Sequence, residues 1–150
     1  MWRILGMIFF HEKEYFLTAD KKSFDEQRIR YFLEERGIAV ADMGAAVIRQ
    51  KDNASDQFLK IVQAIDLNGM LQQLPFCVAV VTTGQKATET LLLQVETGQP
   101  PLGGYSTFTL GDRKVRLYRM PSSSRAYPKP LEEKAAVYRR MFEEIGGYFQ

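Results

Sequence analysis

The chain has 150 residues, of which 45% are hydrophobic and 25% are charged, and its formal net charge is only +2. These totals fit one soluble globular domain over residues 1–150 and exclude a general electrostatic attraction to an anionic partner. A chain of this length buries about 70% of the surface that its unfolded form exposes. Cys77 is the only cysteine, which excludes an intramolecular disulfide and a cysteine-based metal site.

The first ten residues predict a core helix, because Trp2, Leu5, Ile8 and Phe9 recur at helical spacing in an apolar run. The run is too short to span a bilayer, and no small-residue cleavage site follows it. With the single cysteine, this predicts a cytoplasmic protein that has no membrane partner, no cofactor and no metal.

A second helix is predicted to begin at Ser23, where Ser23 and Glu26 form a capping-box pair, and to end at Gly37. Residues 38–41 (IAVA) then predict a short buried strand, with Asp42 at its carboxyl end. A helix, a glycine and a strand in this order are typical of an α/β layer fold.

Two further helices are predicted before the middle of the chain. Ser55 caps the first, with Phe58, Leu59, Val62 and Ile65 facing inward. A shorter helix follows Asp66, with Leu67, Met70 and Leu71 inward, and ends near Pro75.

Residues 76–81 (FCVAVV) predict the strongest strand of the chain. Their continuous apolar run indicates burial on both faces, as in a parallel sheet. Residues 82–86 (TTGQK) lead from this strand into a helix over 87–95. A glycine turn of this kind presents backbone N–H groups at a helix N-terminus, where anions bind, although it is equally an ordinary strand-to-helix turn.

The last third of the chain predicts a hairpin and a final helix. Residues 106–110 and 114–120 flank a Gly111-Asp112 turn. The second strand stops at Pro121, which lacks an N–H group, and three serines follow in what we call the serine loop, residues 121–124. Pro130 opens a helix with one apolar stripe, made by Leu131, Ala135, Tyr138, Met141, Phe142 and Ile145.

Basic residues gather around the serine loop. Between residues 112 and 129 there are six bases and one acid, the bases being Arg113, Lys114, Arg116, Arg119, Arg125 and Lys129. This cluster is compatible with an anionic partner, and equally with a solvated face on an ordinary strand and loop.

Strands at 38–41, 77–81 and 115–120, each followed by a loop and a helix, predict a three-layer α/β/α sandwich with a small, mainly parallel sheet. Ligands of such sheets bind beyond the carboxyl ends of the strands. Three segments are expected to meet there: Asp42, residues 82–86 and residues 121–127.

At these residues the chain resembles the uracil-DNA glycosylase superfamily, most closely the branch that acts on uracil or hypoxanthine in DNA. Residues 120–126 (MPSSSRA) are similar to that branch's Leu-Pro-Ser-Thr-Ser-Pro-Ala loop, and residues 82–87 (TTGQKA) to its third-strand turn. Its second-strand region is similar to residues 37–42, to Arg49 and to residues 53–56. The helix that follows its first motif is similar to the helix that begins at Trp2.

The chain departs from the family pattern in three places. The family's first strand and its Gly-x-x-Pro motif would lie upstream of Met1. Some branches carry a histidine where Met120 stands, and Arg125 replaces the proline of the related loop. Because that first strand is central in the family, we expect a rearranged sheet here, or exposed sheet edges that lead to a homo-oligomer.

The resemblance implies a base-excision DNA-repair glycosylase, which hydrolyses the N-glycosidic bond of uracil or hypoxanthine in DNA when its first motif is present. Asp42 is the candidate catalytic residue, for water or sugar contact, and is otherwise a hydrogen-bonding residue at a strand end. The implied DNA-binding residues are Pro121, Ser122, Ser123, Ser124, Arg125, Tyr127, Thr83, Gly84 and Lys86.

Two other functions stay open at this point. The basic run from Arg113 to Lys129 also fits a non-catalytic module that binds nucleic acid. The turn at Gly84 and the helix after it also fit an α/β domain that binds a nucleotide or another small molecule.

Overall fold

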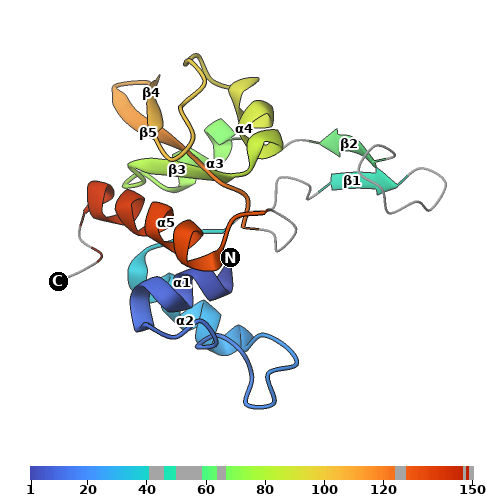
Figure 1. Ribbon diagram of the computed structural model, residues 1–150. Coiled ribbons are helices and arrows are strands. Elements are labelled where there is room, and N and C mark those ends of the chain that lie inside the picture. The colour runs from blue at the N-terminus through green and yellow to red at the C-terminus, as the bar shows by residue number, and fades with distance from the viewer. Residues whose placement is uncertain (41–45, 50–58, 64–66, 124–127, 147, 149–150) are drawn as a thin grey trace.

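The computed structural model describes residues 1–40, 46–49, 59–63, 67–123, 128–146 and 148 (Figure 1). The fold is mixed α/β. Its elements in chain order are α1 (Trp2–Phe10), α2 (Glu26–Arg36), β1 (Ala46–Arg49), β2 (Leu59–Gln63), α3 (Leu67–Gln73), β3 (Ala79–Thr83), α4 (Gln85–Leu92), β4 (Tyr105–Leu110), β5 (Arg113–Met120) and α5 (Leu131–Ile145). None of the described helices is long and apolar enough to cross a membrane.

The larger sheet has the strand order β3-β5-β4. Strand β3 runs parallel to β5, with Ala79 opposite Arg116, and β4 runs antiparallel to β5. The pair β4–β5 is the predicted hairpin, since Leu110 and Arg113 close the two-residue turn at Gly111-Asp112. The sheet is therefore mixed, and the prediction of a mainly parallel sheet is not confirmed.

The central strand β5 contributes to a core on each of its two faces, because successive side chains of a strand point to opposite sides. Val115 and Leu117 pack with residues of α3 and α4 in one cluster. Tyr118 and Met120 pack with residues of α1, α2 and α5 in the other. All four side chains are fully buried, so β5 is the most enclosed strand of the described sheet.

Helix α5 lies between the sheet and α1 (Figure 1). Its predicted stripe is confirmed, because Ala135, Tyr138, Met141 and Phe142 are buried against Ile4, Leu5 and Ile8 of α1. Pro130 precedes the first helical residue, where its fixed φ favours the start of a helix.

Three sequence predictions in the first half of the chain are wrong. The cap of α2 is Asp25, whose carboxylate accepts the Arg28 N–H, and not Ser23. Residues 38–40 form no strand, because the Ile38 N–H bonds the Leu33 carbonyl and closes the end of α2 around Gly37. Residues 59–63 belong to strand β2, which pairs antiparallel with β1, and not to a helix.

The prediction that residues 76–81 are buried on both faces is also wrong. Phe76 is 93% exposed and precedes the strand, and Val78 and Val81 are exposed. The reason is the position of β3, which is one of the two outer strands of the described three-stranded sheet and pairs there only with β5. Cys77 is half-buried, and its thiol donates to the Ala79 carbonyl at 3.2 Å.

Candidate functional site

Two loops meet where the parallel strands β3 and β5 end. The Gly84 N–H donates to the Met120 carbonyl at 2.9 Å, which ties the end of one strand to the end of the other. A Cβ atom added to Gly84 would lie 3.8 Å from the Cβ of Ser122. Of the three segments predicted to converge, the described parts of two therefore meet, while Asp42 and residues 124–127 lie outside the described residues. We call residues 83–86 and 121–123 the loop pair.

Gly84 has a backbone conformation that suits glycine almost exclusively. Its φ of 95° and ψ of 162° lie in a region where a Cβ atom is strained. The glycine turns the chain directly from β3 into α4, and no side chain caps the helix. The first backbone N–H groups of an α-helix lack partners within the helix, and the positive end of the helix dipole lies there. Because α4 begins directly after Gly84, this end of the helix is close to the contact between Gly84 and Ser122. Lys86 adds an exposed cation in this first turn.

Buried hydroxyl groups hold β3 and α4 together behind the loop pair. The Thr82 and Thr88 hydroxyls lie 2.7 Å apart, and both side chains are buried. The Thr82 hydroxyl also lies 3.0 Å from the Tyr118 carbonyl, and the Thr88 hydroxyl lies 2.9 Å from the Gly84 carbonyl. Each hydroxyl has one proton, so one of them donates to its carbonyl while the other donates either to its own carbonyl or to the first hydroxyl. These bonds fix the start of α4 relative to the sheet and so fix the position of the glycine turn.

The serine loop is supported from α5. The hydroxyl of Tyr138 donates to the Pro121 carbonyl at 2.6 Å, and both residues are buried. Burial raises the pKa of the Tyr138 hydroxyl well above its usual value, so this group stays protonated and remains a donor at physiological pH. Pro121 is thereby held at the point where β5 ends.

We expect Tyr138→Phe to reduce the free energy of unfolding by about 1–2 kcal/mol, because the buried Pro121 carbonyl loses its partner. Urea unfolding followed by circular dichroism measures the change. Tyr31→Phe is the matched control, since Tyr31 lies on α2 and is 69% exposed. Equal effects of the two substitutions would contradict a supporting role for the Tyr138 hydroxyl.

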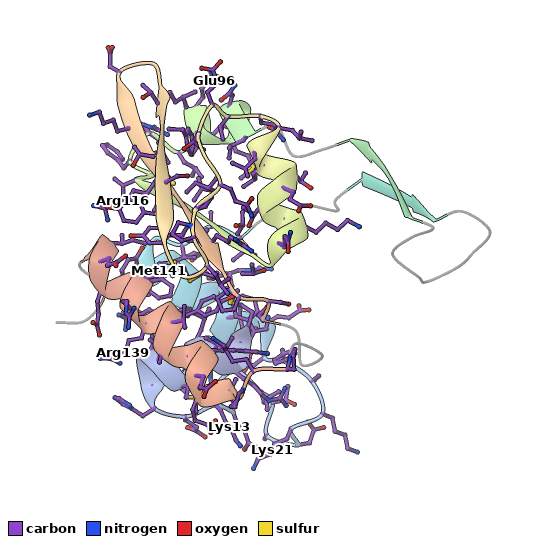
Figure 2. The ribbon with its side chains drawn as sticks, turned by 45° about the horizontal axis from the view of Figure 1, so that its top comes forward. Lys13, Lys21, Glu96, Arg116, Arg139 and Met141 are labelled. Atoms are coloured by element: carbon purple, nitrogen blue, oxygen red, sulfur yellow. The ribbon has the colours of Figure 1, made fainter. Side chains whose placement is uncertain are left out.

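The basic residues of β5 do not form one surface. The Arg113 guanidinium donates to the Leu71 and Leu74 carbonyls at 3.2 Å, and Arg119 donates to the Pro100 carbonyl at 3.4 Å. Arg116 points to the other face, where it lies 4.6 Å from the ring centroid of Tyr105 and donates to the Tyr118 hydroxyl (Figure 2). The predicted basic cluster is therefore divided between the two faces of the sheet, and part of it is used in internal contacts.

The structure brings together Thr83, Gly84, Pro121 and Ser122, with Lys86 exposed in the first turn of α4. Ser123 lies against a cavity near α1. Asp42, Ser124, Arg125 and Tyr127 lie outside the described residues. Among the residues that are described, no group of three or more histidine, cysteine or acidic side chains is arranged to hold a metal ion.

Sequence reasoning missed Thr88 and Tyr138 as parts of this site. Thr88 follows Gly84 by one helical turn, a spacing that lets a threonine hydroxyl return to the carbonyl four residues earlier. Tyr138 belongs to the apolar stripe of α5, and only its hydroxyl distinguishes it from the other core residues of that helix.

Comparison with known proteins adds no relative to these observations. No protein-family model matches the chain, and no similar protein was found among curated proteins or among solved structures.

Proposed function

We propose that this chain is a DNA glycosylase-like protein of base-excision repair, related to the uracil-DNA glycosylase superfamily, and that the loop pair holds the DNA backbone. The three-layer α/β/α order of that superfamily is part of the proposal. The two separate side-chain clusters on the faces of β5 support it, one with α3 and α4 and the other with α1 and α5.

The observation that carries the proposal is the close approach of Gly84 to Ser122 at the uncapped start of α4. A phosphate group accepts hydrogen bonds from backbone N–H groups and hydroxyls and is attracted to a helix N-terminus. A glycine lets the backbone itself approach the phosphate. Lys86 supplies a nearby positive charge, which strengthens binding without reading the base sequence.

The excision step needs more than binding of the DNA backbone. The target nucleotide must be flipped out of the duplex, and the sugar becomes positively charged as the glycosidic bond breaks. We propose Asp42 for contact with the attacking water or the sugar. In the family, the remaining catalytic groups belong to the Gly-x-x-Pro motif.

The test is an excision assay on duplexes that contain uracil or inosine, followed by alkali cleavage. It compares this chain with a version extended by the codons upstream of Met1. We expect the extended protein to cut at least one of the two substrates. If the extended protein leaves both substrates intact, the enzyme proposal fails for these bases.

A binding titration over a range of salt concentrations tests the loop pair separately. We expect Lys86→Ala to weaken duplex binding and to reduce the salt slope by about one, as the loss of a single phosphate contact does. Lys114→Ala is the control, because Lys114 is an exposed cation of β5 away from the loop pair. An effect of Lys114→Ala as large as that of Lys86→Ala would favour a non-specific nucleic-acid-binding module.

Self-association through the sheet edge stays a proposal. The exposed side chains of Phe76 and Val78, just before the outer strand β3, and of Val81 within it favour this association. Light scattering that gives a monomer mass across the micromolar range would contradict it.

A further inference from the structure

A cavity of about 240 Å³ lies between the first turns of α1 and α5. Ser123 of the serine loop borders it, so the loop has Gly84 beside Ser122 on one side and this cavity beside Ser123 on the other. The lining side chains are mostly aromatic, basic or apolar: Met1, Trp2, Arg3, Ile4, Phe24, Ser123, Lys129, Leu131 and Lys134.

The charge around the cavity is positive. Arg3 of α1, Lys129 just before α5 and Lys134 of α5 line it, and no carboxylate is among the described lining residues. Lys134 is only 4% exposed, so water screens its charge less than that of a surface lysine. Burial, and after it the nearby charges of Lys134 and Arg3, lower the pKa of the Met1 amino group.

The backbone adds to this field. Both α1 and α5 begin at the cavity, and neither start is capped by a side chain. The positive ends of two helix dipoles therefore meet at one place, together with the hydroxyl of Ser123 as a donor. Glu132 and Glu133 lie in the first turn of α5 but are exposed and do not line the cavity.

Aromatic side chains also line the cavity. Trp2 is half-buried and is held edge-on against Phe16 with ring centroids 6.0 Å apart, and Phe24 is 42% exposed at the cavity. The volume is below the range of about 300–1,000 Å³ that is typical of drug-sized ligands. A compact anion fits inside, and a flat ring attached to it can rest on the exposed aromatic surface.

We propose that this cavity binds the phosphate group of a nucleotide, with Arg3, Lys129 and Lys134 around the phosphate and the base against Trp2 or Phe24. The ligand is either a free nucleotide or a nucleotide within a single strand. This site shares Ser123 with the loop pair but is otherwise built from different residues, and it does not depend on the proposed excision activity.

Isothermal titration of the full chain tests the proposal with inorganic phosphate, a nucleoside monophosphate and a short single-stranded oligonucleotide. We expect the nucleoside monophosphate to bind more tightly than inorganic phosphate, and both to bind more weakly as salt rises. Tighter binding of the oligonucleotide than of the monophosphate identifies a strand as the source of the phosphate, and the reverse order identifies a free nucleotide. Equal affinity for inorganic phosphate and the monophosphate overturns the role of the aromatic side chains, and no binding of any probe overturns the site.

Substitutions separate this site from the loop pair. We expect Lys129→Ala and Arg3→Gln each to weaken monophosphate binding by at least about tenfold, since each removes a charged partner. Lys13→Ala is the matched control, because Lys13 is an exposed cation beyond the end of α1 (Figure 2). Lys134→Met is a further variant, and its circular dichroism spectrum and unfolding curve show whether it folds. If both Lys129→Ala and Arg3→Gln bind the monophosphate as tightly as the unchanged chain, the proposal is overturned. If only Lys86→Ala loses duplex binding, that result concerns the loop pair and not the cavity.

Discussion

We expect Gly84→Ala to weaken duplex DNA binding by at least about tenfold and to reduce the free energy of unfolding by about 1–3 kcal/mol. The φ of 95° and ψ of 162° at this position are strained for any residue with a Cβ atom. The added methyl also lies 3.8 Å from the Cβ of Ser122, on the surface where a phosphate would approach. Fluorescence anisotropy with a labelled duplex measures the affinity, and urea unfolding measures the stability.

Gly37→Ala is the control for this experiment. Gly37 also has a positive φ, of 67°, but it ends α2, and nothing lies within 4 Å of an added Cβ atom. Its αL conformation costs a non-glycine residue about 1–2 kcal/mol, so the stability of this variant falls while DNA binding does not. If Gly84→Ala and Gly37→Ala bind duplex DNA equally well, the backbone at Gly84 takes no part in DNA binding.

The largest loss of stability is expected from Leu117→Ala. Leu117 is fully buried in the central strand β5 and packs with α3 and α4. Removing a fully buried leucine side chain costs about 2–5 kcal/mol, a large part of the roughly 5–15 kcal/mol that stabilises a domain. The denaturant midpoint of the purified variant measures the loss.

Met120→Ala extends this experiment to the other face of the sheet. Met120 is also fully buried, but it packs in the cluster of α1 and α5. Because the two side chains share no cluster, the effects of the substitutions in a double variant should add to within about 0.5 kcal/mol. Strong non-additivity would contradict two independent cores. Phe76→Ser should change stability little, since Phe76 is 93% exposed.

The elements that the sequence predicts well are those whose signals are local. The turn at Gly111-Asp112 joins adjacent strands, and the stripe of α5 is a helical pattern that needs no knowledge of the partner surface. The meeting of Gly84 with Ser122 was also predictable, because parallel strands end on the same edge of a sheet.

The predictions that failed depend on the identity of the neighbouring elements. An apolar run such as 76–81 has no alternation, so its pattern does not reveal that β3 is an outer strand with Val78 and Val81 exposed. Residues 59–63 carry apolar side chains at spacings that suit a helix, yet their pairing with β1 makes them a strand. Residues 38–40 do not form the predicted strand, because the Ile38 N–H bonds the Leu33 carbonyl and completes the cap of α2.

The candidate site shows the same division. Glycine, serine and proline favour turns because of their own backbone and side-chain chemistry, so the sequence alone predicts the loop pair. The hydrogen bond from Tyr138 to Pro121 could not, because it depends on the rotation of α5 against the end of β5. The division of Arg113, Arg116 and Arg119 between two faces follows from the strand period, which a count of charges along the chain ignores.

The packing of α1 against α5 has a consequence for the order of folding. The β4–β5 hairpin closes over two residues, whereas α1 and α5 come from opposite ends of the described chain, so their contact requires the largest loop closure. The serine loop lies between β5 and α5, and its support from Tyr138 exists only once α5 has docked. We therefore expect the hairpin to form early and the support of the serine loop to be completed late, so that opening of the α1–α5 unit removes the Tyr138 bond to Pro121.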